Sequence, residues 1–598
     1  MQSIGPFSYV RHEPSIPPLD GTRDPARHRV AIAGGGPVGL ALALALARWG
    51  IPSVVLEADD TVCVGSRAIC ISRRSLEIIA RLGALEAFLD KGLDWVGGRS
   101  FYRTGEIFRF TMPHDDDQKL PPMINLQQYW IEQFLVEAIA RQSGLIDLRW
   151  GNEVIRFVQR EDGVGLTVRA GATDPASIDT ASPGTGAAVP GGAAVEYSLD
   201  ADWLVACDGG QSPVRRQLGL KLEGTAFEGK YVIVDIELPS AYPAERRAWF
   251  DPPSNPGYTV LMHKQPDDIW RLDYQIPDDA DLDAALAEPA VAAFVARHLE
   301  MIGEAHLPWR IVWISAYRAG AMTLPRYRYE RILFAGNAAH AMPIFGVRGL
   351  NSGFDDAYNL AWKLAAVIRG WSPIGLLDTY SEERLHAFHI NAASAIQSTE
   401  FMAPPSRGFS LMREAVLSLA QRHRQVASVV NPRQTSAIDY TDSSLNAPSD
   451  HFGGGPAPGS VARECPLDDM VAGATHLGDL LGAHWTALVF CRSGVLPAAL
   501  DRALHALEAG AVPFRTLVAV DRTVPSPRSS AGGRRAQLVD HGARLARRYG
   551  AAEGTVYLIR PDAHVAGRWR GADSAALLAA FARTHPTTTE ADHGHAVR

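Results

Sequence analysis

The pattern of apolar and polar positions predicts three regions of regular structure separated by irregular segments. Residues 29–59 read as an apolar strand, a glycine turn, an apolar helix and a second strand, which is typical of a doubly wound α/β fold. Between about residues 222 and 320 apolar and polar positions alternate, as in residues 257–265 and 270–276, which indicates a separate sheet layer. From His484 onward strands and helices alternate again, so a further α/β domain is expected.

The length of the chain and its Pro-, Gly- and Ser-rich segments predict where the domains meet. At 598 residues the chain is too long for a single core, and roughly two to four domains are expected. Residues 172–194 have the composition of a surface loop that cannot build a core. The expected order is a poorly ordered arm (1–28), a first domain (29–221), a sheet domain (222–320), the return of the first domain with a run of helices (321–440), a linker (441–460), a C-terminal α/β domain (461–585) and a tail (586–598).

Composition and charge exclude several classes of protein. With 46% hydrophobic and 21% charged residues the chain resembles an ordinary soluble protein, and its net charge of −8 includes no basic stripe for nucleic acid. The five cysteines lack CxxC spacing, so neither a disulfide framework nor a metal site is expected, and a reducing cytoplasm fits best. No signal-peptide pattern is present, and the longest apolar run, Val38–Ala47, is too short to cross a membrane.

The first motif that carries chemistry is the glycine turn GGGPVG between the predicted strand and helix. Gly34 permits a tight turn, Gly36 lets a pyrophosphate approach the backbone, and Gly39 lets helix and strand pack closely. The free N–H groups at the start of the helix favour phosphate. Glu57, at the end of the second strand, suits the hydroxyl groups of a ribose. The alternative is a glycine turn used for packing alone, but the combination favours dinucleotide binding.

A second turn follows the apolar strand that ends at Cys207. Asp208 stands at the strand end, before Gly209 and Arg215, and this order can position a phosphate-bearing cofactor over a turn. A tight turn whose following helix is capped by Ser212 explains the same residues equally well.

The third motif lies within residues 331–353, RILFAGNAAHAMPIFGVRGLNSG. It reads as a buried strand, a sharp turn at Gly336 and a loop whose further glycines keep it thin enough for a flat ring to lie against the backbone. A helix is expected over 354–369, with Asn351 or Ser352 as its cap. The dipole of that helix would favour negative charge on the loop, as on a reduced flavin.

In this order and spacing the three motifs resemble the FAD-dependent aromatic hydroxylases of the p-hydroxybenzoate hydroxylase fold, and within them the 3-(3-hydroxyphenyl)propionate hydroxylase group. The resemblance covers roughly residues 29 to 400 and includes VAIAGGGPVGL, the RAI at 67–69, WLVACDGGQSPVRRQL and LLDTYSEER. It implies a Rossmann-like FAD-binding domain, a mixed-sheet substrate domain, and hydroxylation of a phenolic substrate with NADPH or NADH and O2 through a C4a-hydroperoxyflavin. Baeyer–Villiger or epoxidising chemistry on a polycyclic aromatic polyketide or quinone, and flavin binding without turnover, are the alternatives.

The resemblance also assigns cofactor residues. The ADP half of FAD would be held by Gly34, Gly36, Pro37, Val38, Gly39, Glu57 and Ala58, and the pyrophosphate and the ribityl or ribose region by Arg67 and Gln128. Asp208, Gly209 and Arg215 would serve FAD and the passing NAD(P)H. Gly336 and Asn337 would form the turn at the ribityl chain, and Pro343, Gly349, Leu350 and Asn351 would line the isoalloxazine ring. The C-terminal piece resembles a thioredoxin-like domain. Its Cys491 lacks the partner that a redox-active version needs, so a structural role or a homodimer contact is expected.

This chain departs from the family pattern at one cofactor residue, because Asn337 stands where the family has Asp. An amide oxygen still accepts a hydrogen bond from a ribityl hydroxyl but without the charge, so FAD binding weaker by about 1 kcal/mol is expected. Arg348 stands where relatives often have Gln, and it either contacts an anionic substrate or braces the loop.

Candidates for a base or hydrogen-bond acceptor lie on the predicted middle sheet. These candidates are His263, Tyr258, Arg271 and Tyr317, in addition to Arg348. His263 is favoured because His titrates near neutral pH, although core packing is an open alternative for each of them. For His340 a structural hydrogen bond is expected.

Overall fold

The computed structural model describes residues 3–5, 7–142, 144–171, 194–427, 434–521 and 534–586. The predicted surface loop 172–194 and the tail 586–598 therefore lie almost wholly outside the described residues. Among the helices of the described part, none is both long enough and apolar enough to cross a lipid bilayer.

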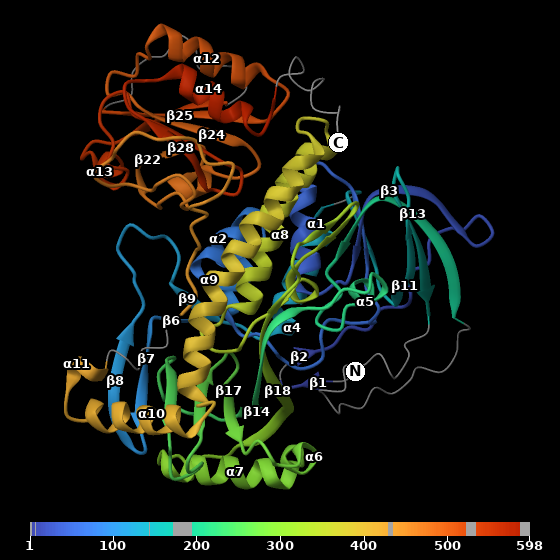
Figure 1. The fold of residues 1–598 in the computed structure, drawn as a ribbon, viewed down its shortest axis with the longest axis vertical. Coiled ribbons are helices and arrows are strands. Elements are labelled where there is room, and N and C mark those ends of the chain that lie inside the picture. Colours follow the sequence, from blue (N-terminus) through green and yellow to red (C-terminus); the bar gives the residue numbers. More distant parts are fainter. Residues whose placement is uncertain are drawn as a thin grey trace.

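The first sheet confirms the Rossmann-like prediction. Parallel strands form its centre, where β3 (Arg23–Ala33) lies between β4 (Ser53–Leu56) and β13 (Val195–Ala206). Its remaining strands are β10 (Ile146–Arg149), β20 (Ile332–Phe334), β19 (Arg328–Tyr329), β12 (Val164–Ala170) and β11 (Asn152–Gln159). Helices α1 (Pro37–Ala47), α4 (Gln128–Ala140) and α8 (Gly349–Ile368) pack together beside this sheet (Figure 1). Because these strands are parallel, their carboxyl ends and the turns that follow them meet at one edge.

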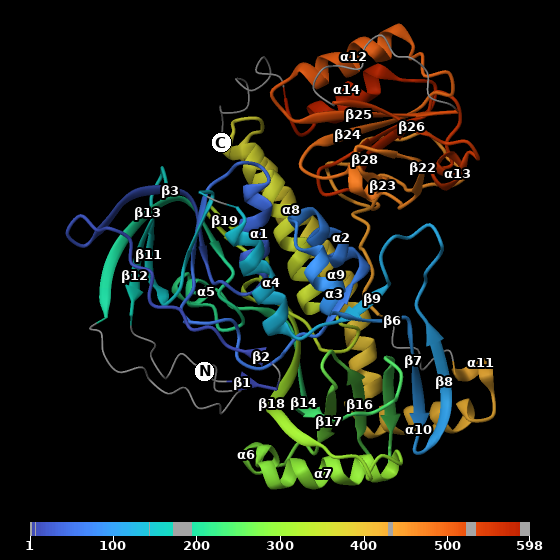
Figure 2. The ribbon, with the colours of Figure 1, turned by 180° about the vertical axis from the view of Figure 1, so that it is seen from behind.

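The second sheet has eight strands in the order β21-β18-β14-β17-β16-β15-β7-β8. Their bounds are His340–Ala341, Arg310–Thr323, Glu223–Glu237, Ile269–Ile276, Thr259–Lys264, Arg246–Phe250, Gly97–Tyr102 and Gly105–Thr111. Three of them, β21, β7 and β8, come from outside the predicted 222–320 region. Helix α7 (Glu288–Met301), after the short α6 (Leu282–Leu286), covers the outer face of this sheet with Val291, Phe294 and Leu299 (Figure 2). Part of the inner face packs against Phe345, Met402 and Leu417, and the rest lines a cavity.

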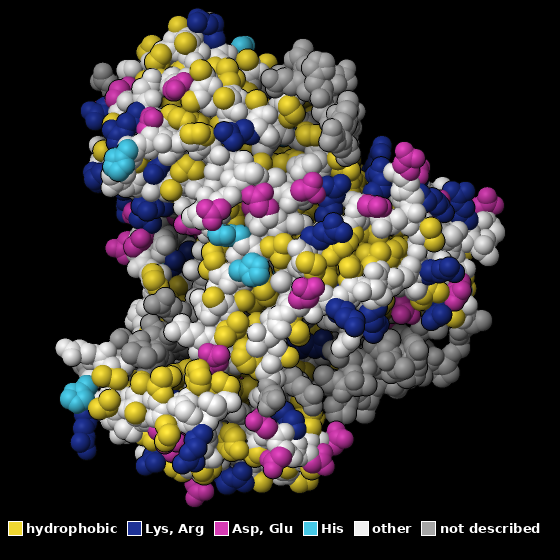
Figure 3. Space-filling model, viewed as in Figure 1, with side chains coloured by type: hydrophobic (Ala, Val, Ile, Leu, Met, Phe, Trp, Pro, Cys, Tyr) yellow, Lys and Arg dark blue, Asp and Glu magenta, His cyan; other side chains and the backbone are white. Residues whose placement is uncertain are grey.

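A small sheet and six further helices of the described residues complete this part of the chain. They are the three-stranded sheet β5 (Cys70–Ser72), β9 (Met123–Asn125) and β6 (Leu93–Trp95), and the helices α2 (Arg73–Leu82), α3 (Leu85–Lys91), α5 (Pro213–Gln217), α9 (Asp378–Met402), α10 (Arg407–Ala420) and α11 (Arg424–Ala427). On the face shown in Figure 3, Lys and Arg side chains are interspersed with Asp and Glu side chains, and hydrophobic side chains are exposed over α10.

The N-terminal arm is packed rather than poorly ordered, which corrects the sequence expectation. Strands β1 (Ser3–Ile4) and β2 (Phe7–Ser8) form a hairpin, and β3 already begins at Arg23. Phe7 and Tyr9 are buried against Tyr129 and Trp130, and the Tyr9 hydroxyl accepts a hydrogen bond from the Gly65 amide at 3.1 Å. Aromatic burial of this kind outweighs the entropy of a short Pro-rich segment.

The C-terminal region is a five-stranded sheet with helices on both sides. Its order is β26 (Arg535–Val539), β25 (Phe514–Val520), β24 (Trp485–Phe490), β27 (Val556–Ile559) and β28 (Val565–Trp569), with helices α12 (Ala498–Ala509), α13 (Arg544–Arg548) and α14 (Ser574–Ala582) and the small hairpin β22 (Pro466–Val471) and β23 (Ala474–His476). The thioredoxin-like assignment stays a prediction. Residues 441–460, expected to be a linker, contribute Leu445, Ala447 and Phe452 to its core.

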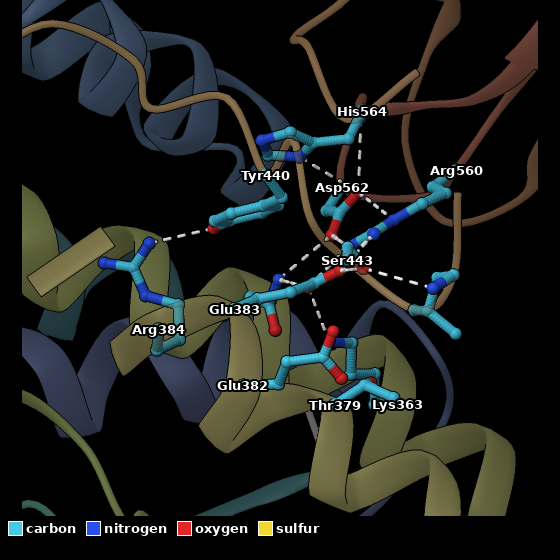
Figure 4. Close-up of polar contacts among 12 residues, drawn as sticks. Lys363, Thr379, Glu382, Glu383, Arg384, Tyr440, Ser443, Arg560, Asp562 and His564 are labelled. Atoms are coloured by element: carbon cyan, nitrogen blue, oxygen red, sulfur yellow. Dashed lines mark hydrogen bonds and ion pairs between the residues drawn. The ribbon is translucent and has the colours of Figure 1, made fainter. Parts of the chain in front are cut away.

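A buried ion cluster joins the C-terminal region to helices α8 and α9 (Figure 4). Arg560 contacts Glu383 of α9 at 2.5 Å and Asp562 at 2.5 Å, and Lys363 of α8 contacts Glu383 at 2.7 Å. Each of these side chains is at most 1% exposed. Tyr440 lies beside this cluster. Charges so completely buried require partners, so the two parts of the chain depend on each other.

Candidate functional site

A single cavity of about 1540 Å³ runs from the carboxyl edge of the first sheet to the inner face of the second. Pockets for one drug-sized ligand are usually about 300–1,000 Å³, so this one has room for a larger cofactor and a substrate. The predicted residues on its wall are Gly34, Gly36, Pro37, Val38, Glu57, Ala58, Arg67, Gln128, Asp208, Gly209, His263, Arg271, Tyr317, Gly336, Asn337, Pro343, Arg348, Gly349, Leu350 and Asn351. Gly39, Arg215 and Tyr258 are not part of the wall.

Gly34, Gly36 and Gly39 of the first turn have different roles. A Cβ at Gly34, whose φ is +101°, would lie 2.5 Å from the Cys207 carbonyl oxygen, and one at Gly39 would lie 2.0 Å from the Gly34 carbonyl oxygen. Both glycines are therefore required for packing. A Cβ at Gly36 would meet no described atom within 4 Å and would project into the cavity. Gly36 is also the N-cap of α1 and makes no side-chain cap, so N–H groups of the first turn are available to an anion.

Glu57 shapes this turn from the end of β4. Its carboxylate accepts hydrogen bonds from the Gly35 amide at 2.5 Å and the Asp59 amide at 2.9 Å. Burial, and then the charge of Asp59, raise the pKa of Glu57 to about 7. Hydroxyl donors from a ribose would favour the ionised form, so the site is suited to a ligand that brings such donors.

Arg67 and Gln128 lie on the wall between the two sheets. The Gln128 amide accepts a hydrogen bond from Ala68 at 3.1 Å and donates one to Glu132 at 2.9 Å. The carbonyl oxygen of Arg67 accepts a hydrogen bond from Arg271 at 2.7 Å. The position of the 66–68 segment is thus fixed from both sides.

The turn at 208–216 contains both a cavity residue and a brace. Asp208 accepts a hydrogen bond from the Val214 amide at 3.0 Å, while its Oδ1 is buried without a hydrogen-bond partner among the described residues, and burial raises its pKa. Arg215, expected at the cofactor, instead donates to the carbonyl oxygens of Ala338 at 2.9 Å and Asn337 at 3.4 Å, so it braces the neighbouring turn. Ser212 caps α5, as expected from the alternative interpretation of this turn as the start of a capped helix.

The 336–341 turn is held from behind by a buried carboxylate. The Gly336 amide donates to Asp356 at 2.9 Å, and His340 Nε2 bonds the same oxygen at 2.7 Å. Although burial opposes ionisation, Arg384 and then His340 hold the pKa of Asp356 well below its ordinary value. Arg384 also donates to the Tyr440 hydroxyl at 2.8 Å. His340 thus has the structural bond expected of it.

Helix α8 begins at Gly349, five residues earlier than predicted, with Arg348 as its N-cap. Asn351 is therefore inside the helix and caps nothing. Its side chain accepts a hydrogen bond from Ser72 at 2.9 Å and donates to the Cys70 carbonyl at 3.0 Å, which ties the start of α8 to β5. The first-turn residues Gly349 and Leu350 line the cavity, so the positive end of the α8 dipole faces it.

Asn337 is exposed at the edge of this turn and lines the cavity. We expect Asn337→Asp to lower the FAD dissociation constant about fivefold, equivalent to about 1 kcal/mol, because a carboxylate accepts a charge-assisted hydrogen bond. Asn337→Ala, which removes the acceptor, should weaken binding. Titration of the flavin absorbance measures both variants. An unchanged dissociation constant in Asn337→Asp would show that this side chain does not contact the ribityl chain.

Two of the middle-sheet candidates make hydrogen bonds that support the fold, and their catalytic role stays a prediction. Arg271 forms two bonds with Asp235, at 2.8 and 2.9 Å, and supports the carbonyl oxygens of Ser66 and Arg67. The Tyr317 hydroxyl donates to the Met342 carbonyl at 2.6 Å, and burial raises its pKa. Tyr258 lies in the turn before β16, where its backbone pairs with that of Asp251 and Asn255, away from the cavity.

His263 and Arg348 are both buried in the cavity wall. Burial, and then the charges of Arg246 and Arg271, lower the pKa of His263 well below its ordinary value, so the expectation of titration near neutral pH is wrong. Burial and the nearby Arg246 lower the pKa of Arg348 to about 10. Arg348 donates to the Phe345 carbonyl at 3.4 Å, which supports the loop-bracing alternative without excluding contact with an anion.

Two residues of this wall were missed by the sequence reasoning. Asp273 and Arg246 are 8% and 3% exposed, and both line the cavity. Arg246 donates to Gln434 at 3.0 Å. The strand WRLDYQI carried a usable signal, because alternation places Asp273 on the same face as Arg271.

Comparisons with known proteins agree with this geometry. Residues 27–393 match the family model described as FAD binding domain. A relative from Escherichia coli (strain SMS-3-5 / SECEC), a 3-(3-hydroxy-phenyl)propionate/3-hydroxycinnamic acid hydroxylase, is 29% identical over 392 residues, which cover 65% of this chain and 65% of the relative. The flavin-dependent monooxygenase PieE with FAD and substrate has a similar fold, with a TM-score of 0.73 and 24% identity over 94% of this chain and 99% of that one. Aklavinone-11 hydroxylase with FAD and aklavinone gives a TM-score of 0.70 at 21% identity, over 94% and 100%.

Proposed function

We propose, from the premise that this chain belongs to the FAD binding domain family, that it uses FAD, NAD(P)H and O2 to hydroxylate a phenolic substrate. The observation that carries the proposal is the single cavity, which joins a dinucleotide-binding turn to a buried, partly polar wall on the second sheet. Five cysteines, none of them in a disulfide, support the expected reducing, cytoplasmic compartment.

The residues of the cavity fit FAD along its whole length. Gly36 leaves open space beside the N-terminus of α1 for the pyrophosphate, and Glu57 offers a carboxylate to the ribose. At the other end, the turn at Asn337 would hold the ribityl chain, and Pro343 with residues 349–351 would lie against the ring. Bound FAD would accept hydride from NAD(P)H and activate O2, chemistry that no side chain supplies.

The tasks left to this chain are to exclude water, orient the substrate and control its protons. Ile233 and Leu261 give the far wall an apolar surface for an aromatic ring. Arg246 and Arg348 place positive charge in the same wall, which suits an acidic or ionisable aromatic compound. The relative named for 3-(3-hydroxy-phenyl)propionate supports a phenolic acid. A homodimer stays a prediction.

A substrate screen tests the proposed activity. FAD-loaded protein is incubated with phenolic acids and polycyclic phenols, NADH or NADPH, and isotopically heavy O2. We expect at least one phenol to stimulate NAD(P)H oxidation and to gain one heavy oxygen as a new ring hydroxyl, identified by mass and NMR. A lactone or epoxide product would favour the Baeyer–Villiger or epoxidation alternative. NAD(P)H oxidation that no aromatic compound stimulates would contradict the proposal.

A further inference from the structure

Asp273 is a buried carboxyl group in the cavity wall that the fold itself does not use. It is 8% exposed, and its Oδ1 has no hydrogen-bond partner among the described residues. A buried carboxyl oxygen without a partner costs free energy, and this one borders the cavity, where a ligand can supply the missing hydrogen bond.

Asp235, the adjacent carboxylate on the same face of the sheet, has a structural role. Asp235 of β14 accepts two hydrogen bonds from Arg271 and one from Gln265 at 3.1 Å. It lies opposite Arg271 across the strand pair, and Arg271 lies opposite His263. Since Arg271 is fully engaged with Asp235 and with backbone carbonyl groups, Asp273 receives no ion pair from it.

The neighbours of Asp273 across the sheet are apolar. Ile233 of β14 and Leu261 of β16 lie opposite it on the two adjacent strands, and both line the cavity. Its open side faces the same cavity that Pro343 and Gly349 line from the loop. A flat ring bound in this cavity would therefore have the loop in one wall and the carboxyl group in another.

We propose that Asp273 accepts the proton of the substrate's phenolic hydroxyl. This role depends on the proposed hydroxylase function. The phenolic O–H bond breaks, the proton moves to Oδ1 of Asp273, and the electron pair stays on the phenolate oxygen. Nothing is oxidised in this step. The phenolate is more electron-rich at its ortho and para carbons, and the carboxyl group returns the proton when the product leaves as a phenol.

The surroundings give Asp273 a suitable basicity. Burial raises its pKa to about 6, although the charge of Arg271 opposes the shift. It is therefore ionised at neutral pH while being a stronger base than an exposed Asp. The charged and titratable groups that face it are Arg271 on its own strand, Asp235 and Tyr231 on β14, Arg246 on β15 and His263 on β16, with Cys70 and Arg348 near Arg246. Because the pKa of His263 lies well below its ordinary value, its imidazole is a weaker base than the Asp273 carboxylate, and Asp273 is the better proton acceptor.

The test compares Asp273→Asn with the wild type in two measurements. In the first, difference absorbance of bound 3-(3-hydroxyphenyl)propionate is followed against pH in FAD-loaded protein without NAD(P)H. Because the negative charge of Asp273 opposes a second negative charge beside it, we expect the bound phenol to ionise at higher pH in the wild type than in the variant. In the second, wild-type kcat should rise with pH through about 6, because the base works only when ionised. Asp273→Asn should lose this limb and about 10²–10⁴ of kcat with a smaller change in KM.

Two further variants separate this role from a structural one. Asp268→Asn makes the same exchange at an exposed position of the same hairpin, and should leave both measurements unchanged. Asp273→Glu, which keeps a carboxylate, should retain the acidic limb. A kcat of Asp273→Asn within about twofold of the wild type, or unchanged ionisation of the bound phenol, overturns the assignment. A wild type that binds phenols but never oxygenates them contradicts the proposed function instead, and the ionisation measurement still decides the role of Asp273.

Discussion

Asp562→Ala is expected to lower the free energy of unfolding by about 3–5 kcal/mol, because it leaves buried charges without their partner. Asp562 is 1% exposed and lies at the centre of the cluster between the C-terminal region and helix α8. It accepts hydrogen bonds from Arg560, from the Trp362 ring nitrogen at 3.0 Å and from the Asn359 amide at 3.3 Å.

The size of this effect depends on the buried charges and hydrogen-bond donors that lose the Asp562 carboxylate. Arg560 and Lys363 would then share Glu383 as their carboxylate partner, in a region from which water is excluded. Burial already lowers the pKa of Lys363 to about 8, so its ammonium group tolerates little further loss of compensating charge. Trp362 and Asn359 would each lose a hydrogen-bond acceptor as well.

Denaturant titration of the free energy of unfolding, with Asp162→Ala as the matched control, measures the effect. The Asp162 side chain is 71% exposed and pairs with Arg27 at 3.1 Å, and breaking such a pair costs about 0–1 kcal/mol. If both variants lost the same small amount, the cluster would not hold the two parts together. A further expectation is weaker FAD binding in Asp562→Ala, because Tyr440 stacks on His564 and also bonds Arg384 behind the 336–341 turn.

Gly36→Val is expected to weaken FAD binding at least about a hundredfold, or about 2.7 kcal/mol, without unfolding the protein. The φ of Gly36 is −70° and its surroundings are open, so a Val side chain fits the backbone and projects into the cavity. There it would occupy the space that the pyrophosphate needs beside α1. Flavin titration measures the affinity, and thermal unfolding without FAD measures the stability.

Gly39→Val provides the contrast three residues away. Its side chain would meet the Gly34 carbonyl oxygen, so this variant should fail to accumulate as folded protein. Comparing Gly36→Val with Gly39→Val distinguishes a glycine required for ligand binding from a glycine required for packing. Normal flavin affinity in Gly36→Val would mean that the pyrophosphate lies elsewhere.

Local patterns made the cofactor end of the site predictable. A strand, a glycine turn, a helix and an acid at Glu57 follow one another within residues 29–59, and each is set by neighbours in sequence. The same holds for Gly336 and the loop that precedes α8. The error in the start of α8 is not local in origin, because tertiary bonds of Asn351 to Ser72 and Cys70 override its short-range capping preference.

Tertiary contacts explain what sequence reasoning missed at the substrate end. Strands β7 and β8 join the second sheet through a parallel pairing of β7 with β15, about 150 residues away in sequence, which no local pattern encodes. His263 was favoured as a base for its ordinary pKa, which burial between two arginines removes. The role of Asp273 could be inferred only from the structure, in which Arg271, its neighbour on the same face of the strand, pairs with Asp235. The role of Asp562 likewise depends on a contact between distant segments.

The central claim is that one chain binds FAD in the cavity between the two sheets. Its most direct test is the absorbance spectrum of the purified wild type after incubation with FAD and gel filtration, beside Gly36→Val treated in the same way. The account predicts a yellow wild type that retains one FAD per chain, and a variant that loses it. A wild type that leaves the column colourless would contradict the account.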